Sequence, residues 1–288
     1  MVGYDFQNDV RLIRACLGLT QTEFANAVGL SRSNIARYEA GEILPRKEAI
    51  ERIYNYAYAK GFDINSSKSL LLDDEKKDSI LLFHGAKGLI VGEVDTKHSV
   101  PPNDFSDGFY LGQSLVQAGS WVASMRDSSI YCFYFRPTED LISMRFAVDA
   151  KWMHAILYYR GGFDGYEVPS SVKNLIRQID ACDYLIAPIA DNQMYDTLEM
   201  FRNNIISDVA CLHALSANHL GLQYVLKSER ACARLSPLSR LYLCQEERKR
   251  YVAAKESLAS DGKSKTSLAI AKYRKEGSLF NELYTKKR

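Results

Sequence analysis

The segment LGLTQTEFANAVGLSRSNIARYEAGEILP (residues 17–45) constrains this chain more than any other. Apolar residues recur there at helical spacing on both sides of Gly29, which predicts two short helices joined by a tight turn. Thr20 and Glu23 have the spacing of a capping box at the start of the first helix. Ser31 is suited to cap the second helix, and Gly41 to end it. Such a pair of helices can place its second member in the major groove of DNA.

Residues 9–50 closely resemble the helix-turn-helix domain of Cro/C1-type phage repressors. The resemblance implies DNA binding through residues 20–38, with a side chain at the start of the first helix against a phosphate and polar side chains of the second helix against base edges. The residues implied are Gln21 for the phosphate and Arg32, Ser33, Asn34 and Arg37 for the bases. Because one unit reads only a short half-site, we expect a homodimer. The alternative is a helix-turn-helix that serves only protein interaction.

Composition and charge divide the chain into four expected parts. The first 64 residues carry eight basic and eight acidic side chains, whereas the last 48 carry 12 basic and six acidic ones. The expected parts are an all-α, five-helix-type helix-turn-helix domain (1–64), a polar linker (65–79), an α+β domain (80–240) and a basic helical tail (241–288). The tail has an apolar face that could pack, dimerise or bind a partner, or it could be partly ordered and solvated.

The middle part alternates between short β-type runs and amphipathic helical segments, in an order that favours an α+β fold over a doubly wound sheet. The predicted strands are 79–85, 108–112, 129–135, 143–148, 183–190 and 222–227. The predicted helices are 114–125, 149–160, 170–181, 195–205 and 208–218. In the tail we expect two helices separated by the break DGKSK.

Four short motifs stand in this middle part: HG at 84–85, DFSDGFY at 104–110, ADN at 190–192 and QYV at 223–225. In this order they resemble a bacterial domain family of unknown function that is related to the diphtheria-toxin-like and poly-ADP-ribose-polymerase-type ADP-ribosyltransferases. The resemblance covers about residues 80–240. It implies two small sheets around a cleft and NAD as the substrate.

The resemblance also implies roles for single residues. His84 would bind a ribose hydroxyl, Tyr110 would stack on the nicotinamide ring, and Gln223 would take the third position of a His–Tyr–Glu triad. The residues implied to contact NAD are His84, Gly85, Asp104, Phe105, Gly108, Phe109 and Tyr110. Each of the three triad positions also has a structural interpretation, as a hydrogen-bonded histidine, a core tyrosine and a strand-edge glutamine.

Gln223 departs from the triad because an amide carries no negative charge and cannot act as a base. The acceptor must then already be nucleophilic, or another carboxylate must help. Asp104, Asp107 and Glu229 are the candidates that lie near in sequence. Asp191 and Asn192 reverse the commoner Asn-Asp order, which leaves an acceptor-side role for that motif open.

Other classes of protein are disfavoured. The six cysteines are scattered without metal-ligand spacing, so we expect buried thiols and no metal. We find no phosphate-binding loop, dinucleotide fingerprint or nucleophile elbow. The N-terminus has no apolar signal core, and no apolar stretch is long enough to span a bilayer. We therefore expect a cytoplasmic protein without a membrane partner.

Together these features predict a DNA-binding protein with an NAD-dependent mono-ADP-ribosyltransferase domain. Such a protein could be a toxin of a toxin–antitoxin pair or a phage-defence effector, held in check by an antitoxin or another partner protein. A transcriptional regulator whose middle domain senses NAD or a nucleotide without catalysis is the alternative. A DNA-binding scaffold whose middle domain only contacts a partner is a third hypothesis.

Overall fold

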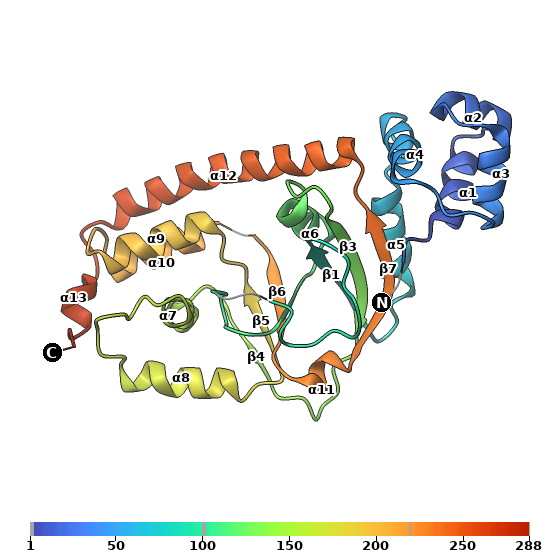
Figure 1. Ribbon diagram of the computed structural model, residues 1–288. Coiled ribbons are helices and arrows are strands. Elements are labelled where there is room, and N and C mark those ends of the chain that lie inside the picture. The colour runs from blue at the N-terminus through green and yellow to red at the C-terminus, as the bar shows by residue number, and fades with distance from the viewer. Residues whose placement is uncertain (1–2, 100–101, 219, 288) are drawn as a thin grey trace. The chain divides into compact units, whose positions relative to one another are not determined.

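A computed structural model of the chain describes residues 3–99, 102–218 and 220–287 (Figure 1). The chain divides into two compact units, and each unit is assembled from segments that lie far apart in the sequence. The first unit comprises residues 1–92, 114–135 and 236–254, and the second comprises residues 93–113, 136–235 and 255–288. Both the helix-turn-helix and the strand that carries His84 therefore belong to the first unit.

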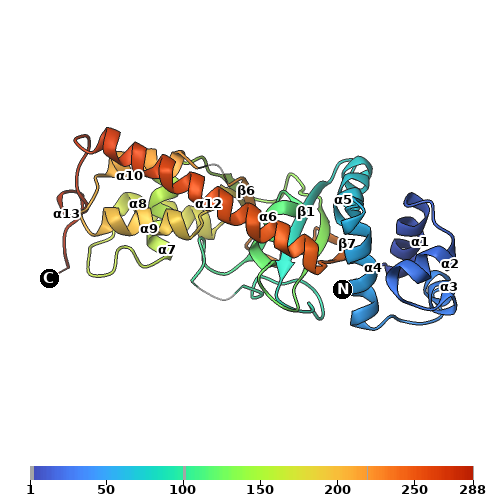
Figure 2. The same ribbon diagram turned by 90° about the horizontal axis from the view of Figure 1, so that it is seen from above.

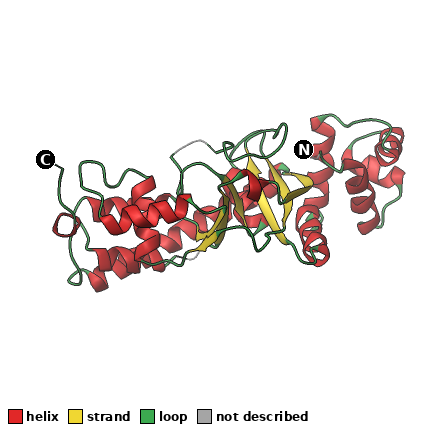
Figure 3. Cartoon of the chain, turned by 90° about the horizontal axis from the view of Figure 1, so that it is seen from below, coloured by secondary structure: helices red, strands yellow, loops and turns green. Residues whose placement is uncertain are grey.

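Residues 3–79 hold five helices, and Figure 3 shows them without a strand among them. They are α1 (Phe6–Cys16), α2 (Gln21–Val28), α3 (Arg32–Ala40), α4 (Lys47–Ala59) and α5 (Ile64–Glu75). The first four lie within the expected helix-turn-helix domain (1–64), whereas the fifth lies almost wholly in the segment expected to be a linker. The apolar positions of the first four helices meet in one core around Phe24, Ile35 and Ile53, whose side chains are fully buried. Tyr242 and Cys244, from much later in the chain, complete this core.

The segment expected to be a linker is helix α5 instead. The Asp63 side chain caps this helix by accepting a hydrogen bond from the Ser66 backbone N–H. Asn65 is buried, and its Nδ2 donates to the Tyr242 carbonyl at 2.8 Å. The polar composition of residues 65–79 suggests a linker because α5 buries only Ile64 and Asn65 and so shows little apolar periodicity.

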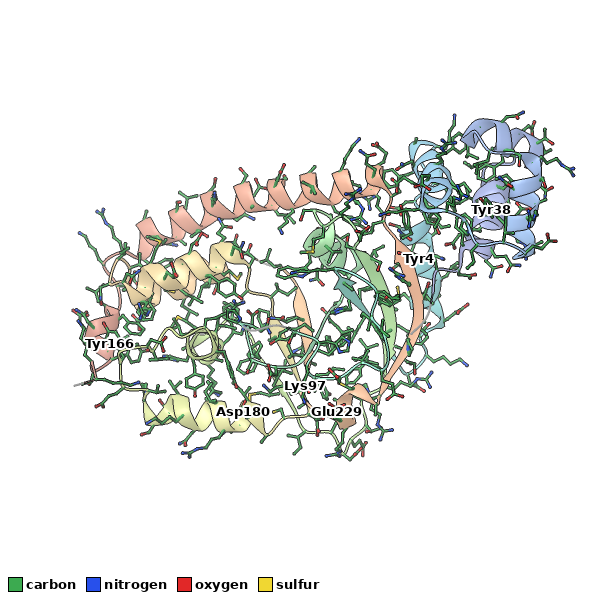
Figure 4. All side chains as sticks on the ribbon, viewed as in Figure 1. Tyr4, Tyr38, Lys97, Tyr166, Asp180 and Glu229 are labelled. Carbon is green, nitrogen blue, oxygen red and sulfur yellow. The ribbon has the colours of Figure 1, made fainter. Side chains whose placement is uncertain are left out.

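The first unit also contains the start of the basic tail, together with three strands and one helix: β1 (Ile80–Ala86), β3 (Ser129–Phe135), β7 (Leu235–Tyr242) and α6 (Leu115–Val122). β1 and β3 pair antiparallel, with His84 opposite Tyr131. Tyr4 forms an isolated bridge with Arg240 of β7, and Figure 4 shows Tyr4 beside that strand. The N-terminal residues are thus tied to a strand that lies more than 200 positions further along the chain.

The second unit contains four strands: β2 (Phe109–Gly112), β4 (Ser143–Arg145), β5 (Tyr184–Pro188) and β6 (Leu222–Leu226). β6 pairs antiparallel with both β2 and β5, and β4 pairs parallel with β5. Five helices fall within its described residues before position 235: α7 (Ala150–Tyr159), α8 (Ser170–Asp180), α9 (Asn192–Arg202), α10 (Asp208–Ser216) and α11 (Glu229–Cys232). The helices enclose a large core that includes Trp152, Phe201 and Val225.

The strands join in one seven-stranded mixed sheet of order β4-β5-β6-β2-β1-β3-β7. The predicted α+β class and all six predicted strands are confirmed. This single hydrogen-bonded order replaces the two small sheets that the family resemblance implied. Strand β7 was not predicted, because Pro237 lies within it and a proline in a sequence run argues against a strand there.

The basic tail forms α12 (Gln245–Tyr273) and α13 (Phe280–Leu283). α12 runs without interruption through DGKSK, so the predicted break is wrong. Gly262 is buried at a close approach, because a Cβ there would lie 2.5 Å from Gln193 Oε1. From residue 255 on, α12 lies along α9 and α10 (Figure 2). Phe280 of α13 is fully buried in the core of the second unit, so the tail is packed rather than solvated.

Candidate functional site

The helix-turn-helix has the local geometry that its sequence predicts. The Thr20 hydroxyl accepts from the Glu23 backbone N–H, and the Glu23 carboxylate accepts from the Thr20 backbone N–H, which forms the capping box. Gly29 ends α2 in the left-handed region, with φ of 65°. The Ser31 side chain then caps α3 by accepting from the Asn34 backbone N–H. The turn between α2 and α3 is therefore fixed from both sides.

Helix α3 presents polar side chains along one face. Arg32 and Ser33 are exposed, and Asn34 beside them is half-buried. Arg37 is about half exposed, and its Nε lies 3.6 Å from the Glu42 carboxylate. An ion pair that long between exposed groups contributes little to stability, so it does not hold the guanidinium away from another anion.

Gln21 lies at the start of α2, but its side chain is engaged within the domain. Its Nε2 donates to the Glu39 carboxylate of α3 at 2.8 Å. Arg14 of α1 donates to the same carboxylate from Nε at 2.6 Å. These contacts join α1, α2 and α3. The roles of Arg14 and Glu39 could not be predicted from the sequence, because these contacts join residues 25 and 18 positions apart.

His84 and Gly85 lie on β1 in the first unit. Gly85 packs directly under α6, since a Cβ there would meet the Ala118 carbonyl oxygen at 2.7 Å and Val122 Cγ1 at 2.8 Å. The glycine is thus required by helix–strand packing in this unit. The His84 side chain is half-buried.

Tyr110 and Gln223 lie on neighbouring strands of the second unit. In the β2–β6 register, Tyr110 is opposite Val225 and Gly112 is opposite Gln223. Directly opposed residues share a face of the sheet, and so do residues two apart on one strand. Tyr110 and Gln223 are therefore on the same face, one diagonal step apart.

Asp104 brings a buried negative charge to Gln223. Its side chain is only 7% exposed. Gln223 Nε2 donates to Asp104 Oδ2 at 2.8 Å and to the Pro188 carbonyl at 3.2 Å. Of the three carboxylates that the sequence put forward, the structure brings this one to Gln223, whereas Asp107 and Glu229 are exposed. Figure 4 shows Glu229 on α11.

Two further side chains converge on Asp104. Arg160, at the end of α7, donates from a terminal guanidinium nitrogen to Asp104 Oδ1 at 2.9 Å. The Tyr195 hydroxyl of α9 donates to the same oxygen and accepts from Arg160. Burial raises the pKa of Tyr195, and the neighbouring Asp104 charge raises it further. Tyr195 therefore stays a neutral donor. The Arg160 guanidinium also lies 4.0 Å from the centroid of the Tyr195 ring.

Sequence reasoning missed Arg160 and Tyr195. They lie at the ends of two predicted helices, where the local pattern indicates only a boundary. Asp104 is 56 and 91 positions away from them. No signal in a single sequence links positions so far apart, because the contact depends on the packing of α7 and α9 against the loop before β2.

Residues 104–108 form a tight loop that leads into β2 and is held by contacts with Tyr110, Lys227 and β6. The Tyr110 hydroxyl donates to the Ser106 carbonyl at 2.7 Å and accepts from the Phe105 backbone N–H. Lys227 Nζ donates to the Phe105 carbonyl at 2.7 Å. Gly108 is pressed against β6, where a Cβ would lie 2.8 Å from Val225 Cγ1. The loop therefore places Asp104 and Tyr110 relative to β6.

The phenylalanines of this loop belong to the protein interior. Phe105 and Phe109 both have fully buried side chains. Phe105 packs against Phe146 with ring centroids 5.5 Å apart. Their implied part in holding NAD is thus restricted to backbone atoms and to support of the loop.

The ADN motif has a structural role at the start of α9. The Asp191 side chain accepts from the Met194 backbone N–H and so caps the helix. Asn192 is exposed at the first helical position. Aspartate and asparagine are both favoured at that position, so the cap is compatible with either order of the two residues.

These features define a protein with a helix-turn-helix domain followed by an α+β domain with a buried Asp–Gln–Arg–Tyr cluster. Residues 9–59 match the family described as "Helix-turn-helix domain". Residues 80–236, more than half of the chain, match the family "Protein of unknown function (DUF3990)", and the chain belongs to that family. The helix-turn-helix domain suggests DNA binding.

Searches of curated proteins and of solved structures gave no match. No helix among the described residues is long and apolar enough to cross a membrane. Within residues 3–99, 102–218 and 220–287, no group of histidine, cysteine, aspartate and glutamate side chains has a metal-binding arrangement.

Proposed function

We propose that residues 80–236 act as an NAD-dependent mono-ADP-ribosyltransferase and that the helix-turn-helix domain brings the chain to DNA. The hydrogen bond between Asp104 and Gln223 carries this proposal. It joins two motifs that are 119 positions apart in the chain. Tyr110 lies on the same sheet face as Gln223. An aromatic ring, an amide and a carboxylate are thus gathered where the resemblance calls for NAD-binding groups.

The proposed reaction breaks the bond between nicotinamide and the C1′ atom of ribose. Nicotinamide leaves with the bonding electron pair, and positive charge develops on the ribose, as in glycoside hydrolysis. An acceptor atom then bonds to C1′ and releases its proton to the solvent, because Gln223 cannot act as a base. The protein's part is to orient the two reactants and to stabilise the cation. Tyr110 would stack on the nicotinamide, His84 and Gln223 would bind ribose hydroxyls, and Asp104 would supply the negative charge.

The biological role that fits best is a toxin or phage-defence effector. The helix-turn-helix would then bind an operator for the chain's own expression or direct the enzyme to nucleic acid. A transferase that consumes NAD in its host requires restraint, so we propose an antitoxin or another neutralising partner protein.

The test is to incubate the full chain with NAD labelled in the nicotinamide and, separately, in the adenine. We expect release of nicotinamide, and transfer of the adenine label to a protein, DNA or RNA acceptor or to water. His84→Ala, Tyr110→Ala and Gln223→Ala should abolish release, while Tyr110→Phe should retain part of it. Gln178→Ala, which removes an exposed glutamine from α8, is the matched control. Absence of release with every acceptor would overturn the proposal.

An NAD sensor without catalysis is the second candidate, and the glutamine at position 223 favours it. An amide can bind a hydroxyl but cannot remove a proton. Binding of NAD in calorimetry without release of nicotinamide over hours would identify the sensor. Absence of NAD binding would leave a DNA-binding scaffold.

A further inference from the structure

We propose that Asp104 is the positioning residue that makes glutamine, rather than glutamate, the working residue at position 223. This inference rests on the proposed NAD site. Asp104 would act through Gln223: it orients the amide so that Oε1 is offered to a ribose hydroxyl, and it supplies the negative charge that an amide lacks.

The contacts of Gln223 fix which way its amide points. Nε2 lies 2.8 Å from Asp104 Oδ2 and 3.2 Å from the Pro188 carbonyl oxygen. Both partners are acceptors only, so the NH₂ group must face them. A rotated amide would press its oxygen against a carboxylate. In the part of the chain that the structure describes, no donor contacts Oε1. This oxygen is therefore available to accept a hydrogen bond from a hydroxyl.

Asp104 is itself held on its other oxygen. Oδ1 accepts from Arg160 and Tyr195, and Oδ2 accepts from Gln223. Every one of these partners is a hydrogen-bond donor, and an ionised carboxylate can accept from all of them. The two oxygens of Asp104 thus have separate roles. Oδ1 is bound by side chains of α7 and α9, and Oδ2 orients the Gln223 amide on β6.

A glutamate at position 223 would put a second carboxylate at hydrogen-bonding distance from Asp104. Two buried carboxylates that close repel each other, so the pair titrates as a unit and is fully ionised only at higher pH. Gln223→Glu, which would restore the ordinary His–Tyr–Glu triad, is therefore expected to damage this site. The cluster keeps one negative charge, and that charge is on Asp104.

The test exchanges the two groups. In Asp104→Asn the new NH₂ group faces donors on either side, Gln223 Nε2 or Arg160 with Tyr195, so at least one hydrogen bond is lost. Gln223→Glu creates the carboxylate pair. Each single variant should lower kcat/KM for nicotinamide release by about 100-fold, the usual cost of a misplaced binding group. In D104N/Q223E the new amide can donate to the new carboxylate while its oxygen still accepts from Arg160. We expect a partial recovery, about tenfold above Q223E on the same scale, since the introduced carboxylate also faces the Pro188 carbonyl.

A pH profile separates this role from a structural one. Q223E should gain activity on acidification, as the pair takes up its proton, whereas the wild type should not. The surface pair Asp196→Asn/Gln178→Glu, at exposed positions of α9 and α8, is the control and should match the wild type. If Q223E does not fold at neutral pH, the double variant carries the test: it must fold and release nicotinamide.

Three results would overturn the inference while the wild type stays active: Q223E at or above wild-type activity, D104N unchanged, or a double variant no better than Q223E. A wild type that releases no nicotinamide would overturn the proposed function, and this assignment with it.

Discussion

The Gln21 side-chain amide of α2 donates a 2.8 Å hydrogen bond to the Glu39 carboxylate of α3. Arg14 of α1 donates to the same carboxylate, whose side chain is only 8% exposed. A residue that the repressor resemblance assigns to a DNA phosphate is thus held in place by a charge on the next helix. The Gln21 carbonyl oxygen cannot bind a phosphate, so any phosphate contact must use the second hydrogen of the amide or the backbone N–H at the helix start.

Glu39→Ala should destabilise the helix-turn-helix domain by about 1–3 kcal/mol, because it leaves Arg14 and Gln21 without their shared acceptor. Burial raises the pKa of Glu39, but the hydrogen bonds from Arg14 and Gln21 outweigh it, and the net pKa lies below its usual value. Stability from this carboxylate is therefore present above the unfolded pKa and lost as pH falls through the folded one. The melting temperature of the wild type should therefore fall on acidification below about pH 4.5. Glu39→Gln should show a smaller dependence; equal slopes would contradict the assignment.

Arg32→Ala and Arg37→Ala should each weaken binding to a preferred DNA sequence. An arginine paired with a guanine contributes about 1–3 kcal/mol of discrimination, so we expect a loss of about tenfold in affinity at each position. The measurement is fluorescence anisotropy with duplexes that the full chain enriches from a random library. Arg11→Ala, at an exposed position of α1, is the control. A two-fold symmetric enriched site, with dimers in light scattering, would support the expected homodimer; equal losses for all three variants would argue against readout by α3.

Local features of this fold could be predicted from the sequence, whereas contacts between distant segments could not. Thr20, Glu23 and Gly29 act within a few residues of themselves, so their cap and turn follow from side-chain chemistry alone. Gly262 shows the limit of that reasoning. A glycine within a polar run indicates a break, but here it allows Gln193 and Asn218 to approach α12 closely.

The candidate site was predictable in part for the same reason. Tyr110 and Gln223 could be proposed because short motifs carry them. The hydrogen bond between Asp104 and Gln223 depends on how β2 and β6 pair. The roles of Arg160 and Tyr195 depend on the packing of α7 and α9 against the loop before β2. These are non-local events that local propensity does not specify.

Gly85→Ala should destabilise the first unit even though position 85 stands in the implied NAD motif. A methyl group there meets the Ala118 carbonyl oxygen at 2.7 Å, and backbone atoms cannot yield as a flexible side chain does. Overpacking of this kind costs about 1–3 kcal/mol. Gly88→Ala is the matched control, since nothing lies within 4 Å of a Cβ at that position. Denaturant unfolding of both variants gives the comparison. A normally stable Gly85→Ala protein that has lost NAD binding would instead point to a direct ligand contact.

Glu247→Gln should stabilise the chain at neutral pH. Glu247 lies near the start of α12, where Asn65 Nδ2 and the Tyr251 hydroxyl donate to its two oxygens. Burial raises its pKa to about 8. For an acid whose folded pKa is raised, stability is fully present below the unfolded pKa and declines as pH rises toward the folded one. The wild type should therefore lose stability between about pH 4.5 and pH 8.

The Glu247→Gln variant keeps an acceptor for Asn65 and lets the Tyr251 hydroxyl act as an acceptor, without the charge. Its melting temperature should equal that of the wild type near pH 4.5 and exceed it increasingly at higher pH. A variant that is less stable at pH 7.5 than the wild type would show that Glu247 is ionised and paired in the folded chain.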